Sequence, residues 1–79
     1  MSQFPSRKEV ERIKKMYPKG TRIQIERMND PYHPIERGTK GTVDHVDDAG
    51  TLHCTFDNGR SLGVVTDADI FHVIDRLNV

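Results

Sequence analysis

The chain has a single cysteine, no tryptophan and no long apolar run. One cysteine excludes the internal disulfide framework that many small secreted domains require, and it favours a reducing cytoplasmic location. No stretch approaches the roughly 20 apolar residues of a membrane span, and no charged-then-apolar leader opens the chain. We therefore expect a cytoplasmic protein that does not associate with membranes.

Apolar residues of every kind are scarce. Only 34% of the 79 residues are hydrophobic, whereas 30% are charged. A chain of this length buries roughly 60% of the surface that its unfolded form exposes, so it can build only one thin core. The sequence predicts a single domain over residues 1–79 with modest stability.

The net charge of zero conceals an asymmetry along the chain. Residues 1–22 hold seven Lys or Arg against two Glu, a net +5, so the remainder carries −5. A basic lead-in therefore precedes an acidic body, and two surfaces of opposite sign are conceivable.

The basic lead-in is predicted to be an amphipathic helix over residues 4–17. Ser6 and Glu9 have the spacing of a capping box, and Pro18 cannot continue helical hydrogen bonding. A helix this short does not persist alone in water, so its apolar stripe needs a docking surface. The stripe consists of Val10, Ile13 and Tyr17, with Met16 at its margin. Either the protein's own body or a second chain can supply that surface, which leaves a monomer and a helix-mediated dimer open.

Five short strands follow between residues 20 and 75. The alternation of apolar and polar residues places them at 21–27, 41–46, 51–56, 60–65 and 70–74. In the first strand, Thr21, Ile23, Ile25 and Arg27 are predicted to share one face. In the third, Leu52, Cys54 and Phe56 should point inward.

Glycines mark the connections between these strands. Asp47-Asp48-Ala49-Gly50 is typical of a type I turn closed by a glycine at positive φ. Asn58-Gly59 predicts a type I′ hairpin turn, in which both central residues have positive φ. Gly38-Thr39-Lys40-Gly41 is interpreted as a third turn, and residues 76–79 are expected to fray.

The predicted fold is mainly β: a small SH3-like five-stranded antiparallel barrel preceded by the helix. A barrel removes exposed sheet edges and needs only a small apolar interior. The alternative is an OB-type barrel. That fold usually has longer strands and a helix between strands three and four, for which residues 56–60 leave no room.

Six segments occur in an order that carries a family resemblance. They are Tyr17-Pro18-Lys19-Gly20-Thr21-Arg22-Ile23, Asp30-Pro31-Tyr32, Pro34-Ile35, Gly38-Thr39-Lys40-Gly41-Thr42-Val43, Val46-Asp47-Asp48-Ala49-Gly50 and Asp57-Asn58-Gly59-Arg60-Ser61-Leu62. The chain resembles a bacterial and phage domain family of unknown function over about residues 17–72, with the helix outside the resemblance. The resemblance implies an origin in a phage or mobile element but no activity. Similar sequences tend to have tryptophan where this chain has Phe56, and Pro-Gly within the segment that reads Thr66-Asp67-Ala68-Asp69 here.

Histidines and the cysteine raise the question of a metal. His33, His45, His53, Cys54 and His72 are scattered singly and lack the paired spacing that brings ligands together. His45 and His53 can meet across adjacent strands, but two surface ligands would bind a metal weakly. We expect no metal and no cofactor.

No catalytic constellation is visible either. Cys54 should be an inert core thiol because His53 points to the other face of its strand. The Asp residues lie at turns, where Asp bonds the local backbone. Gly20, Gly38 and Gly41 are interpreted as turn glycines and not as a phosphate-binding loop. We therefore expect no enzymatic activity.

Binding remains as the expected function. The loop over residues 29–35 combines prolines, which lower the ordering cost, with an aromatic ring that offers a large contact area. The predicted partner-binding residues are Asp30, Pro31, Tyr32, His33, Pro34, Asp47, Asp48 and Asp57. In the competing interpretation, Tyr32 and Ile35 simply cover the open end of the barrel.

The favoured hypothesis is a small non-enzymatic protein-binding module. A compact acidic surface can occupy a basic groove, so its partner could be a nuclease or another nucleic-acid-handling enzyme. An inhibitor of a host defence enzyme, comparable to an anti-CRISPR protein, is one form of it. The alternative is a nucleic-acid-binding accessory protein that uses Arg7, Lys8, Arg12, Lys14 and Lys15. Glu9 and Glu11 interrupt that basic face, which favours an ordinary solvated surface.

Overall fold

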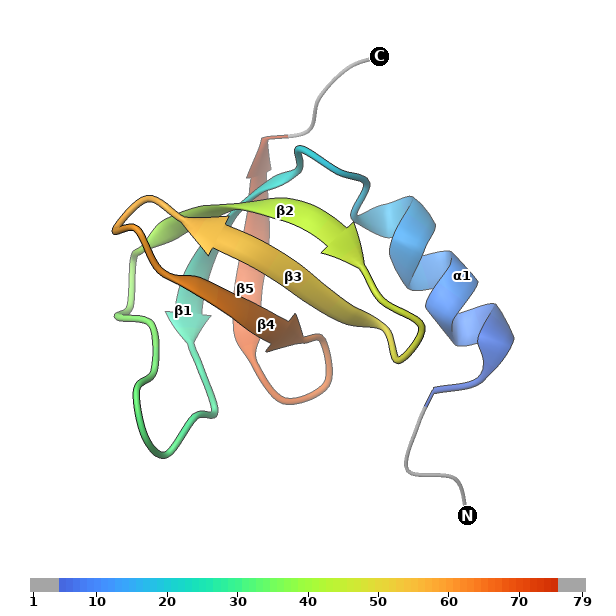
Figure 1. The fold of residues 1–79 in the computed structure, drawn as a ribbon, viewed down its shortest axis with the longest axis horizontal. Coiled ribbons are helices and arrows are strands. Elements are labelled where there is room, and N and C mark those ends of the chain that lie inside the picture. Colours follow the sequence, from blue (N-terminus) through green and yellow to red (C-terminus); the bar gives the residue numbers. More distant parts are fainter. Residues whose placement is uncertain (1–4, 76–79) are drawn as a thin grey trace.

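The computed structural model describes residues 5–75 and consists of one helix followed by one antiparallel sheet (Figure 1). The elements are α1 (Arg7–Met16), β1 (Arg22–Arg27), β2 (Lys40–Val46), β3 (Thr51–Phe56), β4 (Ser61–Val65) and β5 (Ile70–Asp75). The strand order across the sheet is β4-β3-β2-β1-β5. The predicted mainly β class, with five antiparallel strands behind one N-terminal helix, is confirmed.

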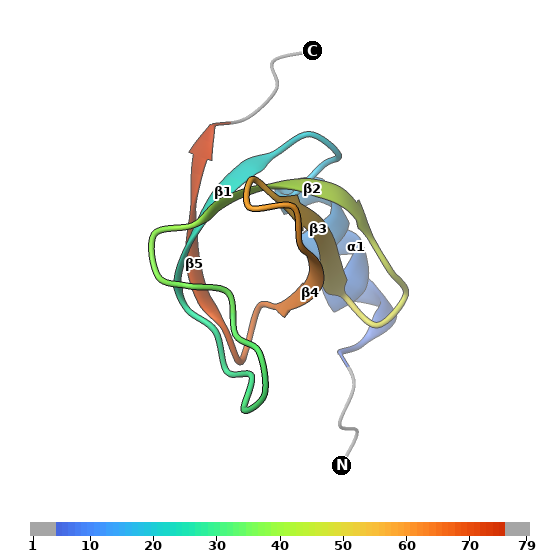
Figure 2. The same cartoon turned by 60° about the vertical axis from the view of Figure 1, so that its left-hand side comes forward.

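The sheet curls around its core into a small barrel-like shape that does not close (Figure 2). The strands β4 and β5 are the two ends of the sheet and are not paired with each other. The expectation that the barrel removes exposed edges is therefore wrong. At residues 66–69 the amides of Ala68 and Asp69 donate to Val65 O, so the end of β4 bonds to this turn, and β5 pairs with β1 instead.

Alternating inward side chains of the strands form the core. Those buried most completely are Ile23 and Ile25 from β1, Val43 from β2, Leu52, Cys54 and Phe56 from β3, and Val64 from β4. The predicted inward face of β3 is thus confirmed. Gly41 was predicted both in the turn at residues 38–41 and at the start of the strand 41–46, and the strand prediction is confirmed. It lies within β2 against the Phe56 ring. A Cβ at Gly41 would stand 2.5 Å from a ring carbon of Phe56, so the large side chain occupies the space that glycine leaves.

The prediction for the last residue of β1 is also wrong. Arg27 is exposed and does not share the inner face with Ile23 and Ile25. The pairing of β1 with β5 shifts register between Ile25 and Arg27. Such an irregularity inserts one residue and breaks the alternation. Met28 takes the inward place instead, with 9% of its surface exposed.

The helix α1 is capped and docked on its own sheet. The hydroxyl of Ser6 accepts from the Glu9 amide at 3.2 Å, as the capping-box spacing predicted. Val10 and Ile13 are buried, whereas Met16 at the margin is 39% exposed. The described helix is shorter than the predicted one, and residue 4 lies outside the described part of the chain. Residues 76–79, which were expected to fray, also lie outside it. Within residues 5–75, no helix has the length and apolar content to cross a membrane.

Two hairpin turns share one geometry. The Gly50 amide donates to Asp47 O at 3.0 Å, and the Gly59 amide donates to Phe56 O at 2.9 Å. Both glycines have positive φ, 82° and 89°, but no non-glycine residue within 5–75 does. The first turn is therefore as predicted, and the type I′ prediction for Asn58-Gly59 is wrong. Both connections have the geometry predicted for residues 47–50, a type I turn closed by a glycine. Only the closing glycine of such a turn needs a left-handed backbone.

A buried carboxylate bridges the gap that the open barrel leaves. Asp69, 9% exposed, stands just before β5. Its Oδ1 accepts from the Asn29 amide at 2.7 Å, and its Oδ2 accepts from the Val65 amide at 2.8 Å. One side chain thus joins the end of β4, the start of β5 and the residues that follow β1.

Replacing this carboxylate should destabilise the fold. Asp69→Ala leaves two backbone donors without their acceptor, at a cost of roughly 1–3 kcal/mol for each donor. Urea unfolding followed by circular dichroism measures the loss. Asp67→Ala in the same connection is the control, because Asp67 is exposed. Equal stability of the two variants would contradict the bridging role.

Candidate functional site

The loop between β1 and β2 presents the most exposed aromatic side chain of the described chain. Tyr32 is 84% exposed. The Asp30 side chain folds back on the loop, and its Oδ1 accepts from the Tyr32 amide at 2.8 Å and from the His33 amide at 3.3 Å. These bonds lower the pKa of Asp30. The carboxylate therefore shapes the backbone that carries Tyr32.

Arg60 holds the far side of the same loop. Its Nη2 donates to His33 O at 2.7 Å and its Nη1 to Pro34 O at 3.3 Å. Ile35 is buried, at 3% exposure. The interpretation that the loop covers the core therefore holds for Ile35 but not for Tyr32, which points to solvent. Residues 30–34 are therefore held by Asp30 within the loop and by Arg60 from the other side, whereas the Tyr32 ring is exposed to solvent.

Asp57, a predicted binding residue, is engaged by the neighbouring strands. Arg22 of β1 donates from Nη1 to Asp57 Oδ1 at 2.9 Å and from Nη2 to Oδ2 at 2.7 Å. The Arg22 Nη1 also reaches Thr42 Oγ1 at 2.9 Å. This fork-to-fork pair lowers the pKa of Asp57, chiefly through its hydrogen bonds.

Asp47, another predicted binding residue, is held by its own turn and by a histidine. Its Oδ1 accepts from the amides of Ala49 at 2.9 Å and Thr51 at 3.0 Å. Its Oδ2 lies 2.8 Å from His53 Nε2. The bond with His53, followed by the backbone bonds, lowers the pKa of the Asp47 carboxyl. The His53 ring stacks on His45 with centroids 4.4 Å apart, so the predicted proximity of the two histidines is confirmed.

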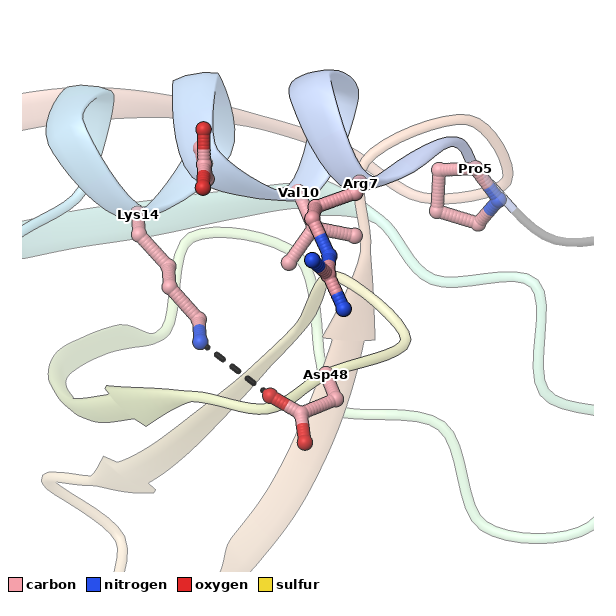
Figure 3. Close-up of a pocket in the computed structure, with 6 residues that line it drawn as sticks. Pro5, Arg7, Val10, Lys14 and Asp48 are labelled. Carbon is pink, nitrogen blue, oxygen red and sulfur yellow. Dashed lines mark hydrogen bonds and ion pairs between the residues drawn. The ribbon is translucent and has the colours of Figure 1, made fainter.

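Asp48 differs from its neighbours because its side chain is fully exposed. It lies across a cleft from α1, and Lys14 Nζ approaches its Oδ1 at 3.2 Å (Figure 3). The cleft encloses about 440 Å³ and is lined by Pro5, Arg7, Val10, Glu11, Lys14 and Asp48. Arg7 and Lys14 both extend from the helix toward the turn that carries Asp48. The basic helix and the acidic body therefore partly neutralise each other.

The predicted nucleic-acid face does not form one uninterrupted basic surface. All five basic side chains proposed for it, those of Arg7, Lys8, Arg12, Lys14 and Lys15, are exposed. Arg12 pairs with Glu9 at 3.3 Å, as Lys14 does with Asp48. Both pairs are solvent-exposed and therefore weak.

Cys54 lies where the sequence placed it, inside the sheet. It is 1% exposed, and its Sγ approaches Leu52 O at 3.6 Å. Burial raises the pKa of the Cys54 thiol to about 12, so the reactive thiolate is scarce at neutral pH. Among residues 5–75, no three His, Cys, Asp or Glu side chains come together in a group that could hold a metal ion.

Two arginines of this site escaped the sequence prediction. Arg22 and Arg60 organise the surroundings of Asp57 and of the Tyr32 loop. Arg22 contacts a residue 35 positions away, and Arg60 contacts residues 26 and 27 positions away. The only available signal was the outward place of Arg22 on its strand, which does not reveal the residue opposite.

Comparison of the sequence with protein-family models assigns the chain to a family. Residues 6–74 match the Domain of unknown function (DUF4314). The chain belongs to this family. The DUF4314 match begins at residue 6 and includes α1, so the expectation that the helix lies outside the family resemblance is wrong. No curated protein and no solved structure matches the chain.

The Asp47 contacts make part of the stability depend on pH. Because the pKa of Asp47 is lowered on folding, its contribution is complete above the unfolded value of about 3.9 and is lost as the pH falls through the folded value. Asp47→Asn keeps an oxygen for the turn but removes the charge. We expect the variant to be less stable near neutral pH, by about 1 kcal/mol or less because solvent screens the pair.

Urea unfolding at a series of pH values checks this expectation. The difference between wild type and Asp47→Asn should close as the pH falls below about 3.9. Asp67→Asn, at an exposed position in the β4–β5 connection, is the control. A difference that stays constant or grows as the pH falls below about 3.9 would contradict the proposed role of the carboxylate.

Proposed function

We propose that this domain is a non-enzymatic protein-binding module whose contact surface is the Tyr32 loop, residues 29–35. The observation that supports it most is the 84% exposure of Tyr32 on a loop backbone that donates to the Asp30 carboxylate and accepts from Arg60. A thin core would gain by burying this ring, as it buries Ile35, but the loop directs the ring outward.

The physical properties of this loop suit recognition of a protein. An aromatic side chain buries a large area at low entropic cost, and tyrosine is enriched among residues that dominate binding energies. The loop is already ordered before binding, since Asp30 bonds its own loop and Arg60 reaches it from the β3–β4 connection. Preorganisation reduces the entropy lost on association.

The acidic residues give weaker support. Asp47 and Asp57 bond to groups of the same chain, so a partner would have to compete for them. Asp48 is the acid best placed to meet a partner, because its side chain is fully exposed and its pair with Lys14 is a weak surface contact. In the narrower form of the proposal, the domain inhibits a nucleic-acid-handling defence enzyme, and Asp48 would contribute to that contact.

Site-specific crosslinking tests the loop directly. A photoreactive phenylalanine analogue in place of Tyr32 should capture a defined protein from a lysate of the natural host. Quantitative pull-down with Tyr32→Ala should then recover far less of the same protein. A residue that dominates an interface contributes about 2 kcal/mol or more, which corresponds to roughly 30-fold in affinity.

Two further variants distinguish the acidic turn and the helix from the Tyr32 loop in this experiment. Asp48→Lys reports on the acidic turn, and Lys8→Glu with Lys15→Glu reports on the helix. All of these side chains are exposed, so thermal melting should show wild-type stability for each variant. Full recovery of the partner by Tyr32→Ala would overturn the proposal. Loss of binding only in the helix variant, with salt-sensitive nucleic acid retention by wild type, would favour the nucleic-acid alternative.

A further inference from the structure

The strand β5 leaves one edge of the sheet open. It is the last strand in the order β4-β3-β2-β1-β5, and within residues 5–75 its sheet partner is β1 alone. Ile70 is 53% exposed and Ile74 is 41% exposed, and His72 between them has 54% of its side chain exposed. An open edge with exposed apolar side chains is a template for pairing with another strand.

The order of residues in β5 makes this edge complementary to itself. Ile70-Phe71-His72-Val73-Ile74 has the same apolar and polar pattern when read in either direction. In an antiparallel pair of two such strands centred on His72, Ile70 lies opposite Ile74 of the second copy. Phe71 likewise lies opposite Val73, on the other face of the sheet. Each apolar residue from 70 to 74 then meets an apolar one, and every contact occurs twice, as in a two-fold interface. The register of β5 against β1 shifts beside Ile74, between Val73 and Asp75, so the strand is regular from Ile70 to Val73.

The other open edge does not offer the same opportunity. In β4, the Val65 amide donates to Asp69 Oδ2, and Val65 O accepts from the amides of Ala68 and Asp69. Among the outward positions of β4, Ser61 and Gly63 supply little apolar surface, and Val65, which is 43% exposed, lies at the turn that bonds its backbone. The β5 edge has no such cover among the described hydrogen bonds. The exposed side chains of β5 therefore make it the more suitable edge for pairing with another strand.

We propose that two copies of this chain form a dimer by antiparallel pairing of their β5 strands, with His72 on the two-fold axis. The two five-stranded sheets then become one continuous sheet. This interface differs from the helix-mediated dimer that the sequence left open, because the apolar residues Val10 and Ile13 of α1 are already buried on the chain's own barrel. The dimer carries two Tyr32 loops, which would allow bivalent binding.

A cysteine at the axis tests the register. Directly opposed residues of an antiparallel pair have Cα atoms about 4.5–5.5 Å apart, within the range that a disulfide spans. His72→Cys should therefore form a disulfide-linked dimer under mild oxidation. Ser61→Cys, exposed on the other edge strand, is the matched control and should remain largely uncrosslinked. The native Cys54 is buried and should not interfere.

A charge exchange tests the same register without covalent chemistry. Sedimentation should show that the wild-type mass rises from one chain to two with concentration. Ile70→Lys or Ile74→Glu alone should leave a monomer, because a charge then faces an isoleucine. The two substitutions in one chain should restore the dimer, since each introduced lysine faces an introduced glutamate across the axis. Mixing the two single variants should give a heterodimer.

Defined results would overturn the proposal. A wild-type chain that stays monomeric over the whole concentration range excludes the dimer. A dimer that neither single variant weakens, and in which His72→Cys crosslinks no better than Ser61→Cys, lies on another surface. Circular dichroism and thermal melting of each variant exclude unfolding as the cause. These outcomes are independent of whether the Tyr32 loop binds a partner.

Discussion

The carboxylate of Asp69 is the constraint on which the arrangement of this domain depends. Burying a charge is costly unless hydrogen bonds replace its hydration, and the amides of Asn29 and Val65 supply them. By tying the end of β4 to the residues after β1, the side chain directs β5 toward β1. The same bond holds the first residue of the Tyr32 loop. The open β5 edge and the ordered loop therefore have a common origin.

Much of the fold was predictable because its determinants are local. The capping box at Ser6, the alternation through β3 and the closing glycine at position 50 each act within a few residues. The errors arose where a distant residue decides the outcome. Gly41 was predicted in a turn as well as in a strand because its sequence neighbours suit a turn, but its position in β2 reflects the Phe56 ring on the adjacent strand. The outward turn of Arg27 follows from a register shift against β5.

The same distinction between local and long-range contacts applies to the candidate site. The Asp30 bonds that shape the Tyr32 loop span only two or three residues, so the local sequence pointed to that loop. The partner of Asp57 is set by the register of three strands, which single-chain periodicity cannot supply. Asp69 lies in the connection between β4 and β5, but its contact with Asn29 spans 40 residues and was invisible in the sequence pattern. Side chains that organise a small barrel are thus harder to foresee than those it displays.

The fold also changes the meaning of the charge asymmetry. Along the sequence, a basic start and an acidic remainder suggest two opposed surfaces, but Lys14 meets Asp48 and Arg22 meets Asp57 in space. Pairing within the chain weakens the long-range field that would steer a charged partner. The surface also carries exposed apolar side chains, among them Tyr32 on its fixed loop and Ile70 and Ile74 on the open edge. These side chains contribute no burial energy to the fold, and contact with another protein would remove their apolar area from water, which is favourable.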